Sequence, residues 1–236
     1  MLRNRTNNHA GFSLIELLIA MTLTLTVMAM ATKLIAQALN TRTQTNSNLD
    51  ALADAQRALN IMSREIANAG FNLNGNGIID GDTKSDANGN SVLRIRTNAN
   101  RFDDTVSSNA RNGIGVIGED ASEDVKYFVY QASNTNLLAR FDQYASATGT
   151  STVLANRLDS LHMHYFNQKV SYNTSDCDIS NQSAGEVAPS SATYVVLAVC
   201  VQLDAVGRRG SDGYQPARSV LLVSDVSLRN TNLPTY

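Results

Sequence analysis

The stretch GFSLIELLIAMTLTLTVMAMAT, Gly11–Thr32, decides how the chain is organised. From Phe12 onward its 21 residues carry one formal charge, Glu16, and as a helix they would cross a hydrocarbon layer of about 30 Å. Arg3 and Arg5 precede this apolar run, which predicts that the amino end stays in the cytoplasm while the bulk of the chain lies outside. Because a carboxylate at the centre of a bilayer costs about 2.5–3.5 kcal/mol, Glu16 is a candidate functional residue.

The helical pattern continues well beyond this apolar run. The chain has 14 Gly and 3 Pro, yet the segment Phe12–Ala69 contains neither. Its later apolar residues recur at helical spacing and are Leu49, Leu52, Leu59, Met62, Ile66 and Ala69. Gly70 follows them directly, as is typical of a helix end, so we expect one helix of about 87 Å. The segment Asn40–Asn48 is rich in Thr, Asn and Ser, which are poor helix formers, and a continuous helix and a local break both remain open there.

The average composition limits the function classes. The chain has 236 residues, 19 Lys and Arg against 21 Asp and Glu, and a net charge of −2. This balance excludes a strongly basic nucleic-acid binder, and two Cys exclude a disulfide-dense scaffold. The mean hydropathy of −0.18 excludes a polytopic membrane protein and is what one apolar helix attached to a polar head would give.

After Gly70 the period changes from helical to alternating. β-Branched and aromatic runs are separated by Gly, Asn, Asp and Ser, which predicts strands. The expected strands are Ser91–Thr97, Asp124–Gln131, Leu137–Phe141, Arg157–Asn167, Thr193–Leu203 and Arg218–Leu228. We therefore expect an α+β fold in which an antiparallel sheet packs on the amphipathic half of the long helix.

The residues around Gly11 differ from an ordinary secretory signal. Gly11 precedes the apolar core, so a cut after it would remove the basic leader and keep the core. In Gly11, Phe12 and Glu16, followed by the apolar run, the chain resembles the type IV prepilins. The resemblance implies that prepilin peptidase cleaves after Gly11 and methylates Phe12, and that Glu16 pairs with the amino end of a neighbouring subunit and sets its register. It divides the chain into a leader (1–11), a transmembrane or filament-core helix (12–33), an amphipathic extension (34–69) and a β-rich head (70–236).

A second run, REIANAGF at Arg64–Phe71, narrows the resemblance. It is similar to the run that ends the helix in PilW-type minor pilins, and the J-type minor pseudopilins of type II secretion share this plan. The resemblance implies a non-enzymatic subunit of the bacterial inner membrane, with one helix in the membrane, a cytoplasmic amino end and a periplasmic head, that later joins a pilus at the cell surface. The implied partners are other pilin subunits, prepilin peptidase and the inner-membrane assembly platform.

Two other function classes stay open at this stage. A secretion pseudopilin has the same plan, and the head of a tip subunit could act as an adhesin or DNA receptor. The small basic cluster Arg208, Arg209 and Arg218 is more simply a solvated turn, so no nucleic-acid partner is expected. A periplasmic enzyme is disfavoured because the sequence shows no catalytic motif.

The run NLNGNGIIDGDT, Asn72–Thr83, resembles a calcium-binding loop. Its candidate ligands are Asn72, Asn74, Asn76 and Asp80. Gly77 stands at the sixth place, but Thr83 stands where an acidic residue is usual, and the three Asn carry no charge. Any Ca²⁺ site here would therefore be weak; no other cofactor is expected, and the alternative is a Gly- and Asn-rich loop that leaves the helix.

Cys177 and Cys200 are the only cysteines. Outside the cytoplasm a disulfide between them would persist, and closing a loop of about 24 residues is worth about 3 kcal/mol. The alternative is a buried Cys200 and a free loop thiol. His162 and His164 lie two apart on an expected strand and face the same way, but the sequence places no third metal ligand, so ordinary strand positions are the simpler interpretation.

Overall fold

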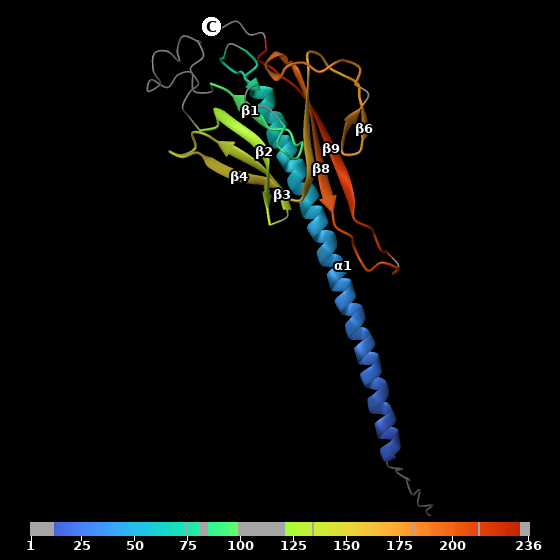
Figure 1. Ribbon diagram of the computed structural model, residues 1–236. Coiled ribbons are helices and arrows are strands. Elements are labelled where there is room, and N and C mark those ends of the chain that lie inside the picture. The colour runs from blue at the N-terminus through green and yellow to red at the C-terminus, as the bar shows by residue number, and fades with distance from the viewer. Residues whose placement is uncertain are drawn as a thin grey trace, which may run out of the picture.

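The computed structural model describes residues 12–73, 75–80, 85–98, 121–133, 135–180, 182–211 and 213–231. A single unbroken helix, α1 (Leu14–Asn68, 55 residues), leads into a β-rich head. Figure 1 shows the first part of α1 projecting away from the head and the second part lying against the strands. This is the α+β, pilin-like architecture expected from the sequence, and α1 runs through Asn40–Asn48 without a break.

Among the described residues the strands form three antiparallel sheets. The first holds β1 (Leu93–Arg96), β2 (Asp124–Ala132), β3 (Thr135–Asp142) and β4 (Thr150–Ala155), in that order. The second holds β5 (Leu158–Phe166), β8 (Tyr194–Leu203) and β9 (Arg218–Ser227), with β8 in the middle. The third is a small hairpin of β6 (Asn173–Ser175) and β7 (Asp178–Ser180).

The six expected strands all exist, with ends that differ by a few residues. The sequence did not predict β4 or the β6–β7 hairpin. β4 is exposed over its first four residues, and the hairpin strands have three residues each, so neither shows the alternation of a half-buried strand. A short 3₁₀ turn, η3 (Pro189–Ser191), precedes β8.

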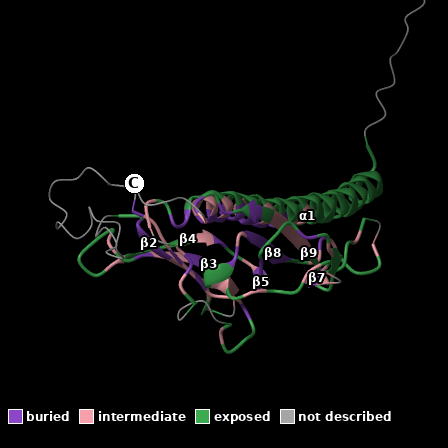
Figure 2. Cartoon of the chain, turned by 90° about the horizontal axis from the view of Figure 1, so that it is seen from above, coloured by how far each residue is buried: buried purple, intermediate pink, exposed green. Residues whose placement is uncertain are grey.

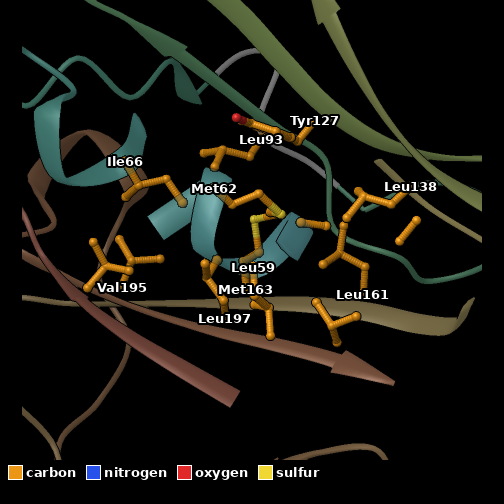
Figure 3. Packing of buried hydrophobic residues seen from close by; sticks show 14 of the residues in the cluster. Leu59, Met62, Ile66, Leu93, Tyr127, Leu138, Leu161, Met163, Val195 and Leu197 are labelled. Carbon is orange, nitrogen blue, oxygen red and sulfur yellow. The ribbon is translucent and has the colours of Figure 1, made fainter. Parts of the chain in front are cut away.

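The main core lies where α1 meets both large sheets. Figure 3 shows Leu59, Met62 and Ile66 of the helix surrounded by residues of the first sheet, such as Tyr127, and of the second sheet, such as Leu197. The helix brings three further buried hydrophobic residues to this core, all of them alanines: Ala51, Ala55 and Ala58. Small side chains allow the helix to approach the sheets closely.

The amphipathic pattern predicted this helix face only in part. Leu59, Met62, Ile66 and Ala69 are buried as expected, but Leu49 is 58% exposed. The buried alanines were overlooked because alanine is common on every helix face and carries little periodic signal.

The second large sheet is covered on both faces. One face packs on α1, and the other carries a smaller cluster that includes Phe166, Tyr194 and Val196 beneath Val170 and Ile179. This double coverage explains why β8 is buried at nearly every position.

The end of α1 depends on two glycines. Gly70 has a φ of +73°, and a Cβ there would overlap the backbone of Gly75 and Asn76. Gly77 has a φ of +75°, and a Cβ there would overlap the backbone of Gly70 and Arg96. The chain therefore leaves the helix at Gly70, as expected. At Gly77 its backbone packs closely against the backbone of Gly70 and Arg96.

Candidate functional site

The first part of α1 has no cover in the structure. Every residue from 12 to 40 is exposed, and Figure 2 shows this stretch in green beyond the head. Its large hydrophobic side chains are bare, from Phe12 at 84% exposure to Leu39 at 58%. Soluble monomers rarely expose an apolar patch of this extent, so the stretch needs lipid or other apolar helices around it.

Within the described residues, α1 is the helix that is long and apolar enough to cross a membrane. The three threonines within the apolar run suit that environment. Thr22 Oγ1 donates to the Ile19 carbonyl (2.9 Å), Thr24 Oγ1 to the Ala20 carbonyl (3.0 Å) and Thr26 Oγ1 to the Leu23 carbonyl (2.8 Å). Each hydroxyl is satisfied by its own helix, so none needs water.

The helix begins two residues after the one that the resemblance makes the mature amino end. Phe12 and Ser13 precede α1, and the Ser13 carbonyl accepts hydrogen bonds from the backbone N–H groups of Glu16 (3.0 Å) and Leu17 (3.2 Å). Glu16 lies exposed in the first turn, where the helix dipole favours a negative charge. Its carboxylate has no partner among the described residues, and Gly11 lies outside them.

The segment that looked weakest as a helix is where α1 first docks on the head. The Asn48 side chain is buried and pairs with the backbone of Asp204: its Nδ2 donates to the Asp204 carbonyl (2.9 Å), and its Oδ1 accepts from the Asp204 N–H (3.1 Å). Gln44 Oε1 accepts from the Gly207 N–H (3.0 Å). Arg157 donates to Ser47 Oγ (3.0 Å) and pairs with the Asp204 carboxylate.

A second polar contact fixes the far end of the docked half. The Glu65 carboxylate accepts a hydrogen bond from the Tyr127 hydroxyl and two from Arg140 Nε (3.1 and 3.2 Å). Arg140 also pairs with Asp142 (3.2 Å). Burial, and then the adjacent Glu65 charge and hydrogen bond, raise the pKa of Tyr127 well above its usual range, so the hydroxyl keeps the proton that it donates.

The loop that resembles a calcium site has other partners. Asn76 Nδ2 donates to the carbonyls of Pro189 (2.6 Å) and Ala192 (2.9 Å), and its Oδ1 accepts from the Ile78 N–H (3.0 Å). Asp80 accepts two hydrogen bonds from Ser190, through its N–H (2.7 Å) and its hydroxyl (2.6 Å). These contacts tie the loop to η3 and account for both side chains without a metal ion. Of the other two candidate ligands, Asn72 is half-buried with a φ of +57°, and Asn74 lies outside the described residues.

The two cysteines are joined in the structure. Cys177, between β6 and β7, forms a disulfide with Cys200 of β8, with their Cα atoms 5.3 Å apart. The bridge fastens the small hairpin to the middle strand of the second sheet.

Comparison with known families supports the amino-terminal part of this description. Residues 6–32 match the family model of the prokaryotic N-terminal methylation motif. No curated protein and no solved structure gives a significant match to the chain. The chain therefore carries the prepilin-type motif on a pilin-like fold, and by inference from that family the motif implies processing by prepilin peptidase and assembly with pilin subunits.

Proposed function

We propose that this protein is a minor pilin of a type IV pilus, a structural subunit that leaves the inner membrane to join, and to prime or cap, the filament. The observation that carries the proposal is the bare apolar half of α1, which bears Glu16 in its first turn and lies largely within the methylation motif at residues 6–32. A membrane can cover this half of the helix before assembly, and the equivalent helices of other subunits can cover it afterwards.

In this proposal, an ion pair that involves Glu16 drives the pairing of subunits during assembly. Cleavage after Gly11 creates a positive amine at Phe12, and this amine and the Glu16 carboxylate would both be costly in an apolar bundle. Pairing the carboxylate of one subunit with the amine of the next neutralises both charges. It also fixes how far one helix sits along another, because only one axial offset brings the two groups together.

The docked half of α1 supports a role for the head on the filament surface. Contacts at Asn48 and Glu65 hold the head to the helix at two separate points. A subunit packed into a bundle through residues 12–40 therefore presents its head in one orientation. The disulfide at Cys177 and Cys200 suits a head that works outside the cytoplasm.

The size of the head and the run Arg64–Phe71 favour a low-copy subunit over a major one. The segment 70–236 is larger than a minimal major pilin needs, and Arg64–Phe71 is similar to the helix end of PilW-type minor pilins. In this proposal the membrane topology is a cytoplasmic leader, residues 1–11, and a periplasmic head.

The test separates processing from assembly in the native host. Mass spectrometry of the mature protein should find Phe12 as the first residue, carrying one methyl group, and Gly11→Ala should leave the leader attached. Glu16→Gln should be processed normally but be absent from sheared filaments, because it keeps the shape and loses the charge. Lys33→Gln, a matched loss of charge near the other end of the bare stretch, should still enter filaments.

Two results would count against the proposal. A wild-type chain that keeps residues 1–11 is not a prepilin, and a Glu16→Gln chain that enters filaments normally has no charge-based register. The runner-up function, a type II secretion pseudopilin, predicts that deletion stops protein secretion and leaves piliation intact. The minor-pilin proposal predicts the reverse.

A further inference from the structure

The face of the first sheet that points away from α1 bears a hollow with two aromatic side chains. Figure 1 shows this sheet beside α1, on the side opposite β8 and β9. In β2, residues 125, 127 and 129 pack toward the helix, so the alternating residues Lys126 and Phe128 lie on the outer face. Together with Arg94 of β1 and Phe141 of β3, they line an open cavity of about 470 Å³, which is within the usual size range of ligand pockets.

The strand register arranges these side chains in rows across the sheet. Lys126 lies opposite Arg94 on one side and opposite Phe141 on the other, so the three form one row. Phe128 stands in the next row, opposite Ala139. The two phenylalanines are therefore diagonal neighbours, about 7–8 Å apart along the backbone, and both rings are within reach of one ligand. The cavity has an apolar end at these rings and a polar end at the row of Asp124.

The Phe141 ring is held in place by the loop between β3 and β4. Gly149 in this loop has a φ of +75°, and a Cβ there would overlap the Phe141 ring. The ring therefore lies directly against the Gly149 backbone, which restricts its movement. A side chain that is already ordered loses little entropy when a ligand packs on it.

The two carboxylates that line the cavity are already paired. Asp124 accepts hydrogen bonds from Arg94 Nε (2.7 Å), Arg94 Nη2 (2.8 Å) and Arg96 Nε (3.0 Å). Asp86 accepts three hydrogen bonds from its own turn, at 2.8, 2.9 and 3.1 Å. Because a carboxylate has about four lone-pair positions, each of the two keeps about one for a donor on a ligand.

Lys126 leaves a positive charge for the ligand. It makes no ion pair within the part of the chain that the structure describes, whereas Arg94 and Arg96 are both paired with Asp124. Counting Asp86, the group has three cations against two carboxylates, so one positive charge is in excess. A matching ligand supplies one negative charge, hydroxyl groups for the carboxylates and an apolar face for the rings.

We propose that this cavity binds a carboxylate-bearing sugar, one uronic acid unit of an acidic polysaccharide. The sugar carboxylate pairs with Lys126, its hydroxyl groups donate to Asp86 and Asp124, and the C–H face of its ring packs on Phe141. This ligand goes beyond the proposed function, because it gives the head a partner outside the filament.

Two other ligand classes fit these groups less well. A nucleic acid carries a phosphate on every nucleotide, and the two carboxylates of the cavity would repel such a dense negative charge. A purely apolar peptide would cover Lys126 without giving it a partner, which is costly.

The test is a ligand-observed NMR titration of the full chain in a polyoxyethylene detergent, whose head group contains no sugar. The probes are the trisaccharides of galacturonate, glucuronate and mannuronate, added separately. At least one should bind saturably with a Kd of about 1 mM or lower, as expected for contact with about one sugar ring. Its methyl ester keeps the ring and loses the charge, so it should bind about tenfold more weakly.

Matched variants locate the site. Lys126→Gln should weaken binding of the acid about tenfold and leave binding of the ester unchanged, since only the acid uses the charge. Phe141→Ala should weaken both, because both pack on the ring. Lys169→Gln and Phe71→Ala remove the same groups from exposed positions elsewhere on the head and should bind as the wild type does. Near-UV circular dichroism checks folding, and Lys126→Gln carries the test if Phe141→Ala misfolds.

Any of three results would overturn the site. These are a wild-type chain that binds none of the three uronates saturably, equal affinity for acid and ester, and acid binding that is unchanged in Lys126→Gln. Tighter binding of a thymidine trinucleotide than of any uronate would likewise assign the face to nucleic acid. None of these results bears on cleavage after Gly11 or on filament entry, so the proposed function stands or falls by its own test.

Discussion

Replacing Asn48 by alanine tests whether α1 is truly fastened to the head at the segment that its sequence marks as a poor helix. Asn48→Ala removes two hydrogen bonds to the Asp204 backbone, at 2.9 and 3.1 Å, from a side chain that is 9% exposed. At about 1 kcal/mol of net stability for each bond, the loss is about 2 kcal/mol. Alanine is the better helix former and returns up to about 0.6 kcal/mol, so the head should lose about 1.5 kcal/mol in its free energy of unfolding.

Asn46 provides the matched control because it lies two residues away on the same helix and is exposed. Asn46→Ala gains the same helix propensity and loses no contact with the head, so its free energy of unfolding should stay unchanged or rise by up to about 0.6 kcal/mol. The two alanine variants should therefore differ by about 1.5–2 kcal/mol, with Asn48→Ala the less stable of the two. Comparing them removes the helix-propensity effect that both share.

Urea unfolding of the full chain in non-ionic detergent measures this difference. The chain has 8 Tyr and no Trp, so near-UV circular dichroism of the tyrosines reports on the head rather than on the membrane helix. The urea midpoint of Asn48→Ala should fall with an unchanged slope, which is the mark of a stability change. If the two variants unfold with equal free energies, α1 is not docked through Asn48 and the polar segment is only a passive stretch of helix.

The core, the helix end and the buried tyrosines give three further tests. In the same urea assay, Met62→Ala should lower the free energy of unfolding by about 2–5 kcal/mol, because the side chain is 0% exposed. Gly70→Ala should destabilise the head more than Gly89→Ala does, since both have positive φ but a Cβ meets backbone only at Gly70. Burial raises the pKa of Tyr127 and Tyr165, so the unfolded chain loses these protons first and the head should lose stability as the pH rises above about 10. Ultraviolet titration should find both phenols ionising together with unfolding, and ionisation of a still-folded head near that pH would contradict the burial argument.

The sequence predicted the features that depend on neighbours in the chain. The absence of Gly and Pro from residue 12 to residue 69 and the glycine at 70 give the length and end of α1, because helix formation and termination are local. The nearly unbroken run of β-branched and other apolar residues in Thr193–Leu203 gives β8 for the same reason. The exposed β4 has no such pattern and was missed.

What the sequence could not show are side-chain partners far along the chain. Asn48 was counted as a poor helix former, yet its partner Asp204 is 156 positions away. Asn76 resembled a calcium ligand in its local run, but it bonds to Ala192 across 116 positions. His164 had no visible partner within its strand, yet its ring contacts Asp178 on the β6–β7 hairpin (2.7 Å). In each case the sequence showed the residue type, but it did not show the group that pairs with the side chain in the folded protein.

The spacing of the two polar contacts explains why the helix needs both. Ala51, Ala55 and Ala58 line the buried face, and a slip of α1 by four residues, about 6 Å, would put Ala55 where Ala51 had been. The alanines therefore do little to fix the axial position of the helix, which depends on the large buried side chains of Leu59, Met62 and Ile66 and on the polar contacts. Asn48 and Glu65 lie about 26 Å apart along α1, and a slip would separate each from its hydrogen-bonding partners at once. The large buried side chains and the two polar contacts together set the register. A pull on the bare half of α1 is thus passed to the head as a whole, as a subunit held in a filament by its helix requires.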